Sequence, residues 1–182
     1  MGWNSTRFEL LETRIRESVA GKRHVIDVPY YIYLYDPELE VECLKHVKAL
    51  ASRLRRDGIS VEIISLSSLM VDAFQSFGCL NASFLKDEEK KREEIAKDLE
   101  RELLKDIARR LKEKLKDKDI THCAILTRVG SLFPFVHISS LLTQLEGSVH
   151  CTLVILYPGN KEGNMLNYRW ENIRTYYRGE II

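Results

Sequence analysis

The first thirty residues carry a helical pattern of hydrophobic positions. The apolar side chains Phe8, Leu11, Ile15 and Val19 recur three or four positions apart, and most positions between them are polar. Asn4 and Ser5 can cap such a helix at its start. We therefore predict an amphipathic helix followed by a lead-in, which together occupy residues 1–29.

A β-prone run then passes directly into a helix. Residues 30–35 read Tyr-Tyr-Ile-Tyr-Leu-Tyr, and Asp36-Pro37-Glu38 supplies a cap, a proline for the first helical turn and an acid near the positive end of the helix dipole. This helix keeps its apolar positions on one face until Gly58, and residues 59–66 form a short β-branched run. Strand, helix and strand make a βαβ unit, whose helix is expected on one face of a parallel sheet.

Two further helices are predicted in the middle of the chain. Ser67 or Ser68 can cap the first, which ends at Gly78. The second is long and charged, spans residues 86–118, and places an apolar residue at every fourth position. Because four residues overshoot one turn, this stripe drifts around the helix, and one flat neighbour cannot cover all of it. The helix either lies along the domain with a solvated face or projects in part to meet another protein.

The last third of the chain predicts a second βαβ unit. Residues 121–128 and 150–157 read as strands, and residues 135–145 as the helix between them. The aromatic and basic residues that follow, 164–182, suit an edge strand or a hairpin that turns near Glu171-Asn172. The pattern predicts one α/β domain over residues 1–182. Its mainly parallel sheet of about four to five strands is flanked by helices and carries an aromatic C-terminal edge segment.

Composition narrows the class of protein. The 182 residues suffice for one core, and 28 basic against 27 acidic residues give a net charge of +1, so no overall field favours a phosphate backbone. No apolar run approaches the length of a bilayer span, and the start lacks the features of a secretory signal. The four widely spaced cysteines suit free thiols in a reducing compartment. We expect a cytoplasmic protein without a membrane segment.

Motifs that carry chemistry are missing from the sequence. There is no GxxxxGK[ST] phosphate loop, no GxGxxG after a strand and no GxSxG nucleophile elbow. His122-Cys123 and His150-Cys151 begin two strands, but adjacent strand residues point to opposite faces, so buried thiols are the better interpretation than a zinc site. We predict a protein that is not an enzyme and that holds no metal or cofactor.

Two strand-exit loops, residues 130–135 and 157–163, are the most informative feature. Ligands of open parallel sheets collect beyond the carboxyl ends of strands, so these loops could bind a nucleotide or phosphate without hydrolysing it. The candidate contacts are Arg128, Gly130, Ser131, Gly159 and Lys161. Alternatively, glycine and proline only shape two turns while Phe133 and Phe135 enter the core. Direct DNA binding rests on Arg53, Arg55 and Arg56 alone.

The same loops carry a family resemblance. The blocks 126–136, 138–142, 156–159 and 176–178, together with Tyr35-Asp36-Pro37, occur in an order that resembles the BrxB family of bacteriophage exclusion (BREX) defence systems. The motif residues within these blocks are Gly130, Pro134, Phe135, Tyr157, Pro158 and Gly159. The sequence departs from the family at Gly179, where alanine is more usual, and the region 167–170 lacks a Phe-Gly often found there.

The resemblance implies a bacterial cytoplasmic protein that acts in phage defence beside PglZ, BrxC and PglX. It favours an adaptor or assembly role, with DNA reached only through partners. PglZ is the expected docking partner, with BrxC or PglX as further members of the assembly. The candidate anchors, of residue types enriched in interfaces, are Tyr168, Trp170, Tyr176, Tyr177 and Arg178. These aromatic residues could instead pack a C-terminal strand onto the sheet.

Overall fold

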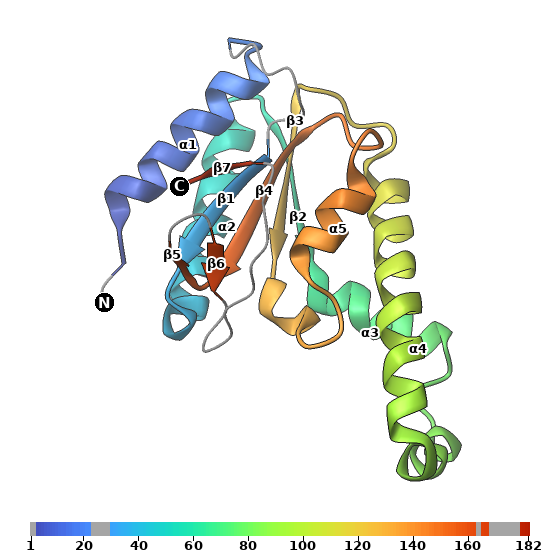
Figure 1. Ribbon diagram of the computed structural model, residues 1–182. Coiled ribbons are helices and arrows are strands. Elements are labelled where there is room, and N and C mark those ends of the chain that lie inside the picture. The colour runs from blue at the N-terminus through green and yellow to red at the C-terminus, as the bar shows by residue number, and fades with distance from the viewer. Residues whose placement is uncertain (1–2, 23–29, 163–164, 168–178) are drawn as a thin grey trace.

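The computed structural model describes residues 3–22, 30–162, 165–167 and 179–182 of the chain, which folds as a parallel sheet with helices on both faces (Figure 1). The helices are α1 (Ser5–Val19), α2 (Glu40–Arg56), α3 (Leu66–Ser76), α4 (Ala82–Leu115) and α5 (Ile138–Leu145), with 3₁₀ turns η1 (Pro37–Leu39) and η2 (Val129–Leu132). The strands are β1 (Tyr30–Tyr35), β2 (Ser60–Ser65), β3 (His122–Thr127), β4 (Thr152–Pro158), β5 (Asn160–Glu162), β6 (Met165–Asn167) and β7 (Glu180–Ile181). The predicted α/β class is confirmed.

The main sheet contains five strands in the order β2-β3-β4-β1-β7, and every pairing in it is parallel. The connection from β1 to β2 contains α2 and crosses over two intervening strands, β4 and β3. The next two connections, from β2 to β3 and from β3 to β4, run in the opposite direction, and each leads to the adjacent strand. α2 packs on one face, and α3, α4 and α5 pack on the other. Since connections that run in opposite directions lie on opposite faces, all three crossovers have the same hand.

β1 supplies both cores because its side chains alternate between the two faces. All six residues are buried, with Tyr30 and Ile32 facing the side of α4, and Tyr31, Tyr33 and Tyr35 facing α1 and α2. An aliphatic strand could fill the same space, so the hydroxyl groups are the distinctive feature of this strand. Each buried hydroxyl needs a hydrogen-bond partner to offset its loss of water.

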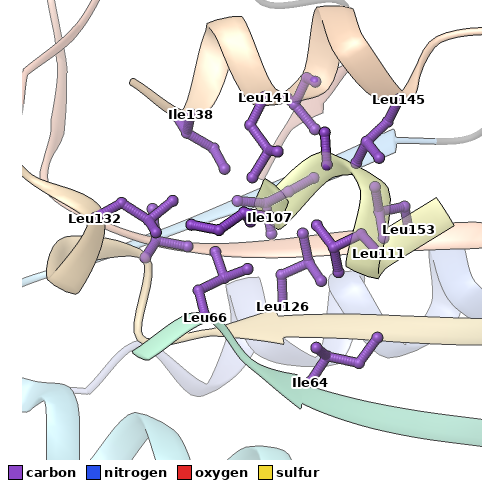
Figure 2. Packing of buried hydrophobic residues seen from close by; sticks show 14 of the residues in the cluster. Ile64, Leu66, Ile107, Leu111, Leu126, Leu132, Ile138, Leu141, Leu145 and Leu153 are labelled. Atoms are coloured by element: carbon purple, nitrogen blue, oxygen red, sulfur yellow. The ribbon is translucent and has the colours of Figure 1, made fainter. Parts of the chain in front are cut away.

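The larger core lies between the sheet and the layer of α3, α4 and α5. Figure 2 shows Ile107 and Leu111 of α4 between α5 and the strands, close to Leu141, Leu126 and Leu153. All five side chains are fully buried. The C-terminal half of α4 is therefore part of the domain core.

The N-terminal half of α4 extends away from the sheet. α4 has 34 residues, and Leu103, Ile107, Leu111 and Leu115 are buried, but Leu99, one turn earlier, is only half-buried. Figure 1 shows the first turns of α4 reaching beyond the ends of the strands. The prediction of a long charged helix is confirmed: its second half lies along the domain, its first turns project, and contact of the projecting part with another protein stays a prediction.

Three predicted helix starts are wrong. α4 spans Ala82–Leu115, whereas the charge pattern predicted residues 86–118. α3 begins at Leu66 because Ser65, the last residue of β2, caps it by accepting a hydrogen bond from the Ser68 amide, so Ser67 and Ser68 already lie inside the helix. α5 begins at Ile138, not at residue 135, because η2 and an irregular segment containing Pro134 come first. The error at α3 arises because β2 passes into the helix without a loop, and the error at α5 arises because η2 and an irregular segment separate β3 from the helix.

The C-terminal residues complete the sheet edge. β7 pairs with β1, placing Glu180 opposite Tyr31 and Ile181 opposite Ile32, so the predicted edge strand is confirmed in these last residues. β5 and β6 form a separate antiparallel pair. The turn expected near Glu171-Asn172 lies outside the described residues.

Glu12 links α1 to α2 through arginine. Its carboxylate lies 2.6 Å from Arg53 Nη2 and 2.7 Å from Arg16 Nη2. Partial burial acts to raise the pKa of Glu12, but hydrogen bonds from the two arginines outweigh this effect and hold the pKa below its ordinary value of 4.5. The ionised carboxylate therefore stabilises the packing of α1.

Glu12→Gln should lower the free energy of unfolding by about 1 kcal/mol at neutral pH, because these ion pairs are partly exposed. Since the folded-state pKa lies below the unfolded value, the stabilisation is complete above pH 4.5 and is lost as the pH falls through the folded-state pKa. Urea unfolding at several pH values measures this, with exposed Glu9→Gln as the control. A difference from wild type that stays constant down to pH 3 would contradict the assignment.

Candidate functional site

The carboxyl ends of β1, β3 and β4 meet at one edge of the sheet. The chain leaves β1 toward the face covered by α2, and leaves β3 toward the face covered by α5. The backbone amide of Gly159, after β4, donates to the carbonyl of Tyr35, at the end of β1, over 2.9 Å. In open parallel sheets this divergence marks the position where ligands bind.

Three side chains connect the exits of β1 and β3. The Tyr35 hydroxyl donates a hydrogen bond to Oε2 of Glu40, the first residue of α2. The other carboxylate oxygen, Oε1, is buried, has no hydrogen-bond partner among the described residues and lies 3.6 Å from Nε of Arg128. We call Tyr35, Glu40 and Arg128 the edge triad.

The chemistry of the edge triad follows from burial. Burial raises the pKa of the Tyr35 phenol strongly, and the adjacent Glu40 carboxylate raises it further. The Tyr35 phenol therefore remains a neutral hydrogen-bond donor. Each of the three side chains already has a partner within the triad. The arrangement therefore favours a structural link between the ends of β1 and β3 over an acid–base pair that transfers a proton.

Arg128 adopts an unusual backbone conformation. Its φ of 60° and ψ of 35° lie in the left-handed region, which costs a side-chain-bearing residue about 1–2 kcal/mol. The amide and the hydroxyl of Ser131 both donate to the Arg128 carbonyl, over 3.0 Å and 2.7 Å, and hold this conformation. Gly130, the glycine of this loop, has no positive φ and lies inside η2, so the left-handed conformation falls on Arg128 instead.

The structure brings most of the candidate phosphate contacts to this edge. Arg128, Gly130 and Ser131 lie at the exit of β3, and Gly159 lies beside Tyr35. Lys161 is on β5 with an exposed side chain. Two of the candidates are already engaged, since Arg128 faces a carboxylate and Ser131 donates to backbone.

The aromatic and proline residues of the two loops take structural positions. Phe135 is half-buried and meets Phe74 of α3 edge to face, with ring centroids 6.2 Å apart. Tyr157 and Pro158 are buried in β4, whereas Pro134 is exposed. The expectation that Phe135 enters the core is thus confirmed in part.

Tyr35 and Glu40 are functional candidates that sequence reasoning missed. The only signal was Tyr35-Asp36-Pro37, which suggested a strand handing over to a helix. It did not show that Glu40 would turn back toward Tyr35 or that Arg128, from a distant part of the chain, would approach it.

The pairs His122-Cys123 and His150-Cys151 are not part of a metal-binding cluster among the described residues. No group of three or more His, Cys, Asp or Glu suited to a metal occurs in the part of the chain that the structure describes. Nδ1 of His122 lies 2.8 Å from the Asp119 carboxylate. Burial raises the pKa of the Cys151 thiol to about 11 and that of Cys43 to about 12, which disfavours reactive thiolates.

Two of the three arginines named for DNA binding have structural partners. Arg53 pairs with Glu12, and Arg55 donates to the Val61 carbonyl over 2.7 Å and 3.1 Å. The five candidate anchors for a protein partner, Tyr168, Trp170, Tyr176, Tyr177 and Arg178, lie outside the described residues. Among the described helices, none has the length and apolar character needed to cross a bilayer.

Comparison with known proteins decides the family. Residues 62–180, from β2 to the start of β7, match the family model described as BREX protein BrxB. The chain belongs to the BrxB family. A BREX protein BrxB from Bacillus cereus (strain H3081.97) is 24% identical over 145 residues, which cover 75% of this chain and 73% of that relative. No solved structure matches the chain.

Membership in the BrxB family makes this chain a component of BREX anti-phage defence, with partners among the proteins of that system. The matched region includes both strand-exit loops and Arg128. Tyr35 and Glu40 precede it. The edge triad therefore joins a residue inside the BrxB match to two residues before it.

Tyr30, Tyr33 and Tyr35 of β1 place their hydroxyl groups in different surroundings, and this difference allows a test of the edge triad. Tyr35→Phe should lower the free energy of unfolding by about 1.5–3 kcal/mol, because it removes a hydrogen bond to a carboxylate that is itself largely buried. Tyr33→Phe should cost less, since its hydroxyl reaches the Asn4 carbonyl at 3.4 Å. Tyr30→Phe should be neutral or stabilising, because the Tyr30 hydroxyl is buried and has no partner among the described residues.

Chemical denaturation of the three variants in parallel measures this order. Each variant loses one hydroxyl from the same strand, so Tyr30→Phe and Tyr33→Phe serve as matched controls for Tyr35→Phe. Equal effects at the three positions would mean that the Glu40 contact adds nothing to stability.

Proposed function

We propose that this BrxB-family chain is a non-enzymatic assembly component of its BREX system and that it docks PglZ. The observation that carries the proposal is apolar exposure at the corner where α3 turns into α4. Val71, Phe77 and Leu80 are 49%, 38% and 62% exposed. They come from one short segment, which begins on α3 and ends just before the projecting half of α4.

Apolar exposure of this kind supports a protein partner. Single exposed hydrophobic residues are common, but several within one short segment favour an interaction site. The polar groups of the edge triad, by contrast, are partnered within the fold. The aromatic residues of the segment 168–178 stay a prediction for the same role.

Co-purification with PglZ tests the proposal. A doubly substituted chain, Val71→Ser with Leu80→Ser, should bind PglZ at least about tenfold more weakly than wild type, because burying two apolar side chains is worth more than 1.4 kcal/mol. Val41→Ser is the matched control, since Val41 is 64% exposed but lies on α2, on the other face of the sheet. Wild-type affinity in the control and loss in the double variant would support docking at the corner.

Two outcomes would count against the proposal. Stable separation of purified PglZ and this chain at micromolar concentration would overturn docking itself. Binding that is unchanged by the double variant would overturn the corner as its site. Substitution of Tyr176 and Tyr177 by alanine would then test the C-terminal anchors.

Phosphate or nucleotide binding without hydrolysis is the second candidate. It is favoured by the positions of Arg128 and Lys161, two cations with accessible side chains that follow the ends of adjacent strands. Calorimetric titration with ATP, GTP and cyclic nucleotides should give heat that Lys161→Ala removes. Flat traces at millimolar ligand would overturn this candidate.

A further inference from the structure

β2 is the outermost strand of the main sheet, at the end opposite β7. It has six residues, whereas β7 has two, so β2 presents the longer outer edge. An outer strand carries a row of amide and carbonyl groups with which another extended chain can pair. As far as the chain is described, the main sheet therefore has one long edge that could take up a further strand.

The groups that β2 directs outward can be assigned from its contacts. The Thr127 hydroxyl of β3 donates to the Ile64 carbonyl over 3.3 Å, so the Ile64 carbonyl faces β3. Successive residues of a strand direct their amides and carbonyls to alternate sides, so Val61, Ile63 and Ser65 direct theirs away from β3. We call these three residues the β2 edge.

Arg55 covers one carbonyl of the β2 edge. It lies in the last turn of α2, and its Nε and Nη2 atoms donate to the Val61 carbonyl over 3.1 Å and 2.7 Å. The donors of a guanidinium form a rigid fork, so two bonds to one acceptor fix the direction of the side chain. Arg55 is an exposed residue, and its charged group therefore stands at the surface beside the outer strand.

The β2 edge is complementary to itself. In an antiparallel pair centred on Ile63, the Ile63 residues of two copies exchange two hydrogen bonds, and Val61 of each copy lies opposite Ser65 of the other. A two-fold axis through the centre repeats every contact, as an isologous interface requires. In this pairing the Ser65 amide of one copy donates to the Val61 carbonyl of the other, which is the group that Arg55 covers.

The guanidinium of Arg55 obstructs such a pairing. Its two hydrogen bonds to the Val61 carbonyl have to break before the strands can meet, once in each copy. Natural sheets protect their outer strands with charged side chains, or by keeping the outer strand as short as β7 is. Arg55 therefore explains how an edge of six residues can remain unpaired.

We infer that Arg55 prevents the β2 edge from pairing with β2 of a second copy. This role goes beyond the proposed docking of PglZ and involves neither Val71 nor Leu80, so failure of either proposal leaves the other standing. It also gives Arg55 a task that does not require DNA.

Arg55→Ala is the first test, with Arg56→Ala as the matched control. In sedimentation velocity up to several hundred micromolar, the wild-type chain should remain monomeric. Arg55→Ala should self-associate at least about tenfold more tightly, because pairing no longer breaks a charged hydrogen-bonded contact in each copy. Arg56→Ala removes the same charge from the next residue and should behave as wild type.

Ile63→Pro in the Arg55→Ala chain should restore the monomer. Proline has no amide hydrogen, and the Ile63 amide faces away from β3, so the substitution removes a bond of the new pairing and none of the ladder within the sheet. Circular dichroism melting checks that the doubly substituted chain remains folded. Hydrogen exchange gives a readout without proline, since the Ile63 amide should become protected in concentrated Arg55→Ala and stay unprotected in wild type.

Three results would overturn the inference. An Arg55→Ala chain that loses stability but stays monomeric would make Arg55 only a clamp between α2 and β2. Association that persists with Ile63→Pro, or that leaves the Ile63 amide unprotected, would place the contact away from the β2 edge. A wild-type chain that associates as tightly as Arg55→Ala would show that the guanidinium obstructs nothing.

Discussion

Leu111→Ala should lower the free energy of unfolding by about 2–5 kcal/mol, the largest effect expected of any single substitution considered for this chain. Leu111 is fully buried and lies between α5 and the strands (Figure 2). Helices and strands enclose it on every side, so the cavity left by alanine cannot collapse fully. Urea denaturation followed by circular dichroism measures the loss, which should appear as a lower midpoint with an unchanged slope.

Leu99→Ala is the matched control on the same helix. Leu99 is half-buried at the point where α4 leaves the domain, so its truncation should cost less than half as much as that of Leu111. Equal losses at both positions would mean that the first half of α4 is packed as tightly as the second, contrary to the structure.

The elements themselves could be predicted because the sequence marks their boundaries chemically. The β-prone side chains of residues 30–35 predict the strand β1, and Asp36-Pro37 predicts the start of the helical segment that follows it. The drifting apolar stripe of α4 correctly indicated that no single neighbour covers the whole helix. Failures came where the local signal was ambiguous, as at Ser65, Ser67 and Ser68, any of which can cap a helix.

Strand order could not be predicted from these local signals. β1 lies beside β4 and not beside β2, because the sheet is closed by contacts between segments far apart in the chain. Hydrophobic patterning states which face of an element is buried, but not against which partner. The same limit explains why β7 could be expected at an edge, while its pairing with β1 could not.

The candidate site shows most clearly which features can be predicted from local sequence and which depend on the whole fold. The rule for parallel sheets correctly placed the exits of β3 and β4 at one edge, and glycine and proline correctly suggested turns there. The hydrogen bond from Tyr35 to Glu40 and the approach of Arg128 depend on the fold as a whole. The left-handed conformation falls on Arg128, although glycine is the residue that usually occupies such positions.

Gly179→Ala should destabilise the edge of the sheet where β7 joins β1. A Cβ atom at this position would lie 2.9 Å from the Tyr30 carbonyl oxygen and 3.3 Å from Tyr30 Cβ. The neighbouring backbone is a strand of the central sheet and cannot move aside, so overpacking should cost up to about 3 kcal/mol.

Hydrogen exchange distinguishes the displacement of β7 from β1 from the backbone strain that alanine causes at a glycine with positive φ. In the native edge the Ile182 amide donates to the Ile32 carbonyl over 2.9 Å, and the Leu34 amide donates to the Ile182 carbonyl over 3.3 Å. Both amides should exchange faster in Gly179→Ala. The control, Gly147→Ala, is strained by its φ of +69° but meets no atom within 4 Å, so it should lose stability without exposing these amides. Unchanged protection of Ile182 and Leu34 in Gly179→Ala would show that β7 does not need the close approach that glycine permits.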